Sequence, residues 1–176
     1  PYMALEYALR KNGIDPATEL TLDSSVQFSM MTAAFTAGTG DYFTCFEPTA
    51  SMLEAEGKGY IVAAVGDAAG EIPYTAYFAK KSYIEKNSDL IAAFTRAVYK
   101  GQQWVGTHTA AEIAEAIKEQ FPDTSTELLT ASIERYQKIG AFCDTPTMTE
   151  ESFTLLQKVI AEAGELSAPA PFDKVV

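Results

Sequence analysis

The residues with the clearest chemical potential lie in the stretch GTGDYFTCFEPTA, positions 38–50. Glu47 ends its aromatic, threonine-containing run and precedes Pro48, which biases Glu47 towards extended geometry at or just before a helix N-cap. A carboxylate there can stabilise a helix N-terminus by about 0.3–1 kcal/mol, accept a hydrogen bond from a ligand amine or ring N–H, or act as an acid or base. Capping and ligand contact both stay open and are compatible. Catalysis is the weakest reading, because nothing else in the chain partners Glu47.

The run before Glu47 offers two further candidate ligand contacts, Thr44 and Phe46. Strand alternation places these two side chains on one face and Cys45 with Glu47 on the other. Phe46 has the flat ring needed to stack on a planar ligand, but it fits a core position equally well. Both interpretations of Phe46 therefore stay open.

Two more places carry candidate ligand contacts. Open α/β sheets bind ligands beyond the carboxyl ends of their strands, where helix N-termini offer unpaired N–H groups. Tyr2 lies at the start of the first expected helix, which Pro1 opens. Tyr74 and Thr75 follow Pro73 at the entry of a later strand, and the Tyr74 hydroxyl could reach a cleft. Both tyrosines also fit plain core or surface positions.

Residue counts limit the other chemistry. With 24 Asp and Glu against 13 Lys and Arg, the formal net charge is −11, and no basic stripe suits a nucleic acid. The single histidine, His108, rules out a histidine metal cluster or a Ser-His-Asp triad within this chain, and we expect no metal and no cofactor. His108 is expected to be solvated in a loop. Cys45 and Cys143 form no disulfide or metal framework and fit small buried positions.

The elements expected to position the candidates alternate between helix and strand over residues 1–65. Gly13, Gly38 and Gly57 each end a helix. The nearly all-apolar run 60–65 is typical of a strand covered on both faces. We therefore predict an α/β fold, doubly wound in this half. Its strands are expected at 19–22, 42–46, 60–65 and 74–79, and its helices at 2–12, between a cap at 23–25 and Gly38, and at 48–56.

The second half is predicted to be mostly helical. Helices are expected at 82–86, from Ser88 to about 104, and near 110–120, 125–139 and 149–163. The last three would begin at capping boxes, Thr109–Glu112, Thr124–Glu127 and Thr147–Glu150. One small sheet cannot cover so many helices. We therefore expect exposed apolar surface unless a partner covers it, and we interpret the chain as lacking an N-terminal part.

Three stretches together resemble the substrate-binding proteins of ABC importers: PYMALEYALRKNGIDP, MMTAAFTAGTGDYFTCFEPTASMLEAEGKGYIVAAV and IPYTAYFAKKSYIEKNSDLIAAFTRAVYKGQQWV. The branch they resemble most is the nitrate, sulfonate, taurine and thiamine-pyrimidine (SsuA/THI5-like) one, and the resemblance spans the whole chain. Tyr42 stands where this branch usually has a small residue. The resemblance implies a type II periplasmic-binding-protein-like fold. Residues 1–73 would be an incomplete second ligand-binding lobe, and residues 74–176 a hinge-return strand with the C-terminal helices of the first lobe.

The resemblance also implies a function. It implies an extracytoplasmic component, periplasmic or a lipoprotein, that binds a small-molecule solute and delivers it to ABC permease subunits, with its own N-terminal lobe as a further partner. The implied ligand contacts are the candidates above: Tyr2, Thr44, Phe46, Glu47, Tyr74 and Thr75. One carboxylate among aromatic residues favours a pyrimidine-like thiamine precursor over alkanesulfonate, taurine or nitrate, because oxyanions are best held by Arg or rows of N–H donors. The alternatives are an enzyme on the same fold, acting on a pyrimidine or menaquinone precursor, and a fragment with structural contacts alone.

Overall fold

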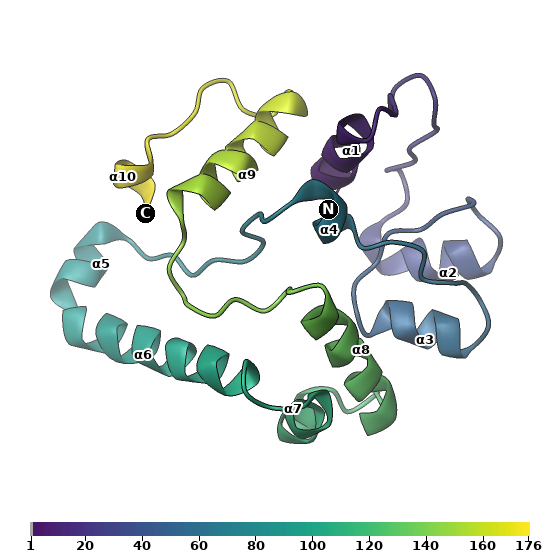
Figure 1. The fold of residues 1–176 in the computed structure, drawn as a ribbon. Helices are drawn as coiled ribbons and strands as arrows, with labels where there is room; N and C mark the ends of the chain where they lie inside the picture. The colour runs from purple at the N-terminus through teal and green to yellow at the C-terminus, as the bar shows by residue number, and fades with distance from the viewer. Residues whose placement is uncertain (1) are drawn as a thin grey trace.

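The computed structural model describes residues 2–176, and the regular structure in that range is helical (Figure 1). Pro1, expected at the first helical position, lies outside the described residues. Two short 3₁₀ turns, η1 (Phe28–Met30) and η2 (Lys118–Gln120), accompany the helices. The helices are α1 (Tyr2–Lys11), α2 (Met31–Thr36), α3 (Thr49–Ala55), α4 (Val65–Ala69), α5 (Lys81–Lys86), α6 (Ser88–Val105), α7 (Ala110–Ile117), α8 (Thr126–Lys138), α9 (Glu150–Glu162) and α10 (Phe172–Val175).

The predicted α/β fold, including its type II binding-protein form, is wrong for this structure, because no β-strand forms within residues 2–176. The predicted strand segments stay outside the helices, apart from Val65, which begins α4. No backbone hydrogen bond joins any two of them in the described chain. Val62 is 73% exposed and Phe78 97% exposed. An extended segment gains sheet stability from a neighbouring strand, and an apolar pattern cannot supply that neighbour.

Most helices follow the sequence expectations, except that the helix expected between a cap at 23–25 and Gly38 is shortened to η1 and α2. Thr109 caps α7 in a complete capping box: its side chain accepts from the Glu112 N–H, and the Glu112 side chain accepts from the Thr109 N–H. The other two helix starts were predicted slightly too early, since the caps are Ser125 for α8 and Thr149 for α9. Helix α4 was not expected, because its residues were divided between a strand and a loop, and the short α10 was not expected either, because the tail from Ser167 is rich in proline.

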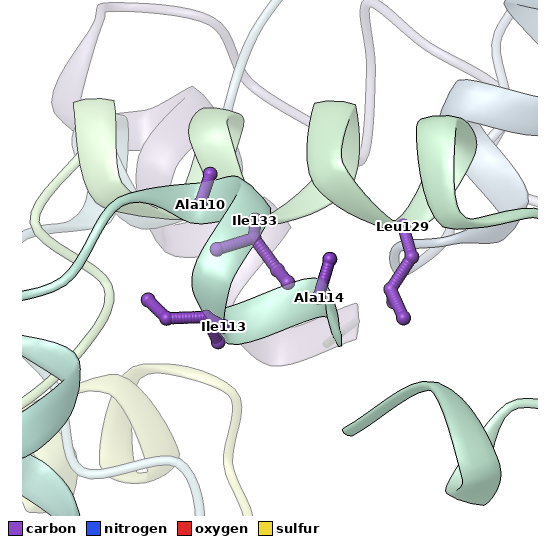
Figure 2. Packing of buried hydrophobic residues seen from close by; sticks show 5 residues of the cluster. All are labelled: Ala110, Ile113, Ala114, Leu129 and Ile133. Carbon is purple, nitrogen blue, oxygen red and sulfur yellow. The ribbon is translucent and has the colours of Figure 1, made fainter. Parts of the chain in front are cut away.

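The buried apolar residues form two separate clusters. The first lies between α7 and α8, where the i, i+3 and i, i+4 spacing of apolar residues gives each helix one buried face (Figure 2). Its members are Ala110, Ile113, Ala114, Leu129 and Ile133. The second cluster joins α1, α4 and α9 through Tyr7, Ala8, Ala69 and Val159. Helices from both sides of residue 73 thus pack together, and the predicted lobe boundary there stays a prediction.

The accessible surface of the structure is large, and many apolar side chains are exposed, as the sequence predicted. Its accessible surface is 12618 Å², whereas a compact monomer of 19.1 kDa has about 8,400 Å². Figure 1 shows α5 and α6 on one side, joined by a long irregular segment to α4. Helix α6 contains no buried residue, and its Leu90 and Phe94 are exposed. Among the helices of residues 2–176, none is long and apolar enough to span a membrane.

Candidate functional site

The candidate segment, residues 44–47, leads from a glycine turn into α3. Gly38 and Gly40 both have positive φ, which an L side chain rarely adopts, so this turn depends on glycine. The chain then runs without regular structure from Tyr42 to Phe46, and residues 43–50 are half-buried. Helix α8 lies beside α3 (Figure 1) and supplies most of the groups that contact Glu47.

The Glu47 carboxylate is engaged on both oxygens. Oε2 accepts from the Ser51 backbone N–H at 2.9 Å and from the Ser132 hydroxyl at 3.3 Å. Oε1 lies 3.5 Å from Nε of Arg135, and the Glu47 side chain is only 7% exposed. Ser51 lies in the first turn of α3, so Glu47, from the position before the N-cap Pro48, satisfies an N–H of that helix terminus, and this one of the two open interpretations is confirmed. Nothing here tests whether Glu47 also contacts a ligand, and that stays a prediction.

Arg135 ties α8 to both ends of α3. Its Nε also donates to the Ser51 hydroxyl at 3.3 Å, and its Nη2 pairs with the Glu54 carboxylate. Glu54 in turn accepts from the Ile61 N–H at 3.2 Å. That backbone hydrogen bond, followed by the Arg135 guanidinium, lowers the pKa of Glu54 from its ordinary value. The polar network therefore holds α3 against α8 and begins to order the chain that leaves α3.

Tyr136 completes the network from the next position of α8. Its hydroxyl accepts from the backbone N–H of Glu47 at 3.1 Å, and burial raises its pKa. Sequence reasoning missed Arg135, Ser132 and Tyr136. The partners lie 81 residues apart for Arg135 and Glu54 and 89 apart for Tyr136 and Glu47, so no local spacing could have revealed them.

Two predicted ligand contacts come together, Phe46 and Tyr74. Their ring centroids lie 5.5 Å apart. Phe46 also contacts Phe28, which was not among the predicted ligand contacts, with ring centroids 6.1 Å apart. Such tilted ring pairs at this distance are favourable. Phe28, Phe46 and Tyr74 are called the aromatic trio below.

The remaining predicted contacts are placed differently. Thr44 is half-buried in the candidate segment, and Thr75 is exposed next to Tyr74. Tyr2 is exposed at the start of α1 and, among the described residues, makes no hydrogen bond or ring contact with the other candidates. The structure therefore brings Phe46 and Tyr74 into contact beside Glu47, Thr44 lies in the same segment, and no contact links Tyr2 to them within the described residues.

A hollow of about 220 Å³ opens beside the candidate segment. Its aromatic walls are Phe28, Phe43 and Phe46, and Cys45 also lines it. The remaining lining residues carry hydroxyls: Ser29, Thr32 and Thr49. Cys45 and Phe46 both line the hollow, although strand alternation was expected to place their side chains on opposite faces. The segment forms no strand, so that alternation does not apply.

The two cysteines and the histidine differ in burial from what the sequence predicted. Cys45 is free and half-buried, and burial, helped by the Glu47 charge, raises the pKa of its thiol. Cys143 is free and exposed, contrary to the buried position expected. His108 is half-buried and stacks on Trp104 with ring centroids 4.0 Å apart. The His108 Nδ1 lies 2.6 Å from the Trp104 carbonyl oxygen. The prediction that His108 is solvated in a loop was therefore only partly right. Within residues 2–176, no three side chains among His, Cys, Asp and Glu gather as a metal site would require.

Comparison with known proteins identifies the class. The sequence profile of the NMT1-like family matches residues 1–119, which include the candidate segment and the aromatic trio. The chain belongs to the NMT1-like family, a family of substrate-binding proteins.

A particular relative can then be named. The chain is 43% identical over 176 residues to "Putative binding protein YtlA" of Bacillus subtilis (strain 168). The match covers 100% of this chain and 53% of that relative, so the chain spans about half the length of the relative that it matches. No solved structure matches the chain.

Proposed function

We propose that the chain belongs to the solute-binding component of an ABC importer, which works outside the cytoplasm and passes its solute to permease subunits. The observation that supports this proposal most is the 43% identity, along the whole chain, to a relative named as a binding protein. Membership of the NMT1-like family agrees with it. The function proposed is binding and release, with no chemical step.

The state of Glu47 supports binding over catalysis. A carboxylate that already contacts Arg135, Ser51 and Ser132 would have to give up those partners to move a proton on a substrate. Its buried contacts instead suit a group that fixes the shape of the segment around it.

The proposed ligand is a small organic solute with a flat ring. A pyrimidine-like thiamine precursor comes first, and alkanesulfonate, taurine or nitrate come next. The proposed contacts are Thr44, Phe46, Glu47, Tyr74 and Thr75, together with Tyr2. The Phe46–Tyr74 pair offers ring faces for stacking. Arg135 does not favour an oxyanion, because its Nε and Nη2 are already engaged by Glu47, Ser51 and Glu54.

Calorimetry on the full-length protein tests the proposal. The titrants are 4-amino-5-hydroxymethyl-2-methylpyrimidine, taurine and nitrate. We expect the pyrimidine to bind most tightly and to remain unchanged after dissociation. Tyr74→Ala should weaken binding, whereas Tyr60→Ala, which removes another exposed tyrosine ring outside the site, should not. Failure of all three solutes to bind, or chemical conversion of any of them, would overturn the proposed function.

A further inference from the structure

The hollow beside the candidate segment combines two kinds of lining residue. Ser29, Thr32 and Thr49 all line it, and within the described chain none of their three side-chain hydroxyls makes a hydrogen bond with the protein. Thr32 and Thr49 are half-buried, and Ser29 is exposed. The hollow therefore brings residues whose hydroxyls are free to bond a ligand together with aromatic rings.

The size of the hollow suits one ring. A cavity of about 150 Å³ binds benzene in an engineered protein, and drug-sized ligands occupy about 300–1,000 Å³. The hollow, at about 220 Å³, falls between these sizes. It can therefore take a single six-membered ring with small substituents, or the ring end of a larger solute.

Each aromatic ring that lines the hollow contacts another aromatic ring. Phe43 stacks on Phe35 with ring centroids 5.4 Å apart and ring planes 23° from parallel. Phe46 contacts both Tyr74 and Phe28. Phe28 is 71% exposed. These ring contacts favour the present arrangement of the three walls.

Among residues 2–176, no charged side chain lines the hollow. The nearest acid in sequence, Glu47, points its carboxylate into the network with α8. An ionised ligand group placed here would lose its hydration without gaining a charged partner. The lining thus selects against charge and in favour of an aromatic ring whose edge can donate to and accept from hydroxyls.

We infer that this hollow is a ring subsite, in which an uncharged aromatic ring packs against Phe28, Phe43 and Phe46 and hydrogen-bonds to the hydroxyls of Ser29, Thr32 and Thr49. The inference rests on the proposed function and adds to it the place where the ring binds, the absence of charge on that ring, and five lining residues that the sequence did not select. It also assigns a reporter, because Cys45 lines the same hollow.

The experiment uses the full-length protein with Cys143→Ser, which leaves Cys45 as the reactive thiol of this region. The rate of Cys45 modification by a thiol reagent is measured with and without 4-amino-5-hydroxymethyl-2-methylpyrimidine, and with taurine as the ringless probe. We expect the pyrimidine to slow modification at least about ten-fold at saturation and taurine to leave the rate unchanged. The same titrations by calorimetry report total binding, wherever it occurs.

Two substitutions locate the contacts. Phe28→Ala should weaken pyrimidine binding by about 5- to 140-fold, the range expected for one lost stacking contact. The control is Phe78→Ala, which removes another exposed phenylalanine ring, outside the hollow, and should change nothing. Thr32→Val keeps the side-chain shape but removes a hydroxyl, and it should weaken binding while leaving the melting temperature within about 1–2 °C of the parent's.

The outcomes separate the two proposals. Pyrimidine binding that leaves Cys45 unprotected and is unaffected by Phe28→Ala overturns the ring subsite but leaves the proposed function intact. Binding of taurine or nitrate alone does the same. If none of the three solutes binds, both proposals fail.

Discussion

Glu47→Gln is the substitution that tests the polar network most directly. The glutamine keeps nearly the same shape and one carbonyl oxygen, so Ser51 and Ser132 can still find an acceptor. The charge facing Arg135 is lost. Hydrogen bonds to charged groups contribute about 1.5–3 kcal/mol, and breaking a fully buried pair costs about 3–5 kcal/mol.

The expected cost lies at the lower end of that range. The Arg135 side chain is 38% exposed and keeps Glu54 as a second partner, so solvent and Glu54 offset part of the loss. We expect Glu47→Gln to lower the free energy of unfolding by about 1–3 kcal/mol. In a chain of 176 residues this lowers the melting temperature by about 2–4 °C per kcal/mol.

Urea unfolding followed by circular dichroism measures this change, with Glu56→Gln as the matched control. Glu56 is an exposed acid at the C-terminal end of α3. A double-mutant cycle of Glu47→Gln with Arg135→Met then isolates the coupling between the two side chains, which should exceed about 0.5 kcal/mol. If Glu47→Gln costs no more than Glu56→Gln, or if the coupling is zero, the network does not hold α3 to α8 and the reasoning is refuted.

Two further predictions concern the packing of α4 and the acid side of the stability curve. Gly70 has φ +109° and a Cβ placed there would lie 3.2 Å from Leu155, so Gly70→Ala should cost about 1–3 kcal/mol. Gly66→Ala, in open space within α4, should be neutral or stabilising by up to about 1 kcal/mol, and urea midpoints distinguish the two. For Glu54, whose pKa lies below its ordinary value of 4.5, stability is present above that pH and lost as pH falls through the folded-state pKa. Glu54→Gln should therefore reduce the loss of stability between pH 5 and pH 3, measured by urea midpoints at each pH, and an unchanged pH dependence would contradict the contacts with Ile61 and Arg135.

The helices could be predicted because their signals are local. Thr109 and Glu112 form a capping box within four residues, and Gly13 directly follows the last turn of α1. The capping by Glu47 is of the same kind, since its acceptor and the Ser51 N–H are four residues apart. These contacts need nothing beyond the chain on either side of them.

The strands could not be predicted in the same way, because a strand is completed by a neighbour. The run from Tyr60 to Val65 has the composition of a buried strand, yet Tyr60 and Val62 are exposed and Val65 enters a helix. A run of apolar residues can be buried in a sheet, but whether it is buried depends on the neighbouring strands and helices that pack against it. Arg135 was missed for a related reason: nothing near it in the sequence shows that its partners lie on α3.

The two parts of the site depend on each other, and the distribution of buried residues shows why. Neither apolar cluster contains a residue of α3, although Leu53 of that helix is buried. The hydrogen bonds and ion pairs that join α3 and the residue before it to α8 belong to the polar network around Glu47. Phe46 and Thr49, which stand immediately on either side of the Glu47–Pro48 pair, line the hollow. A network that fixes Glu47 must also fix these two walls, so weakening it at Arg135 should loosen the ring subsite even though Arg135 lies outside it.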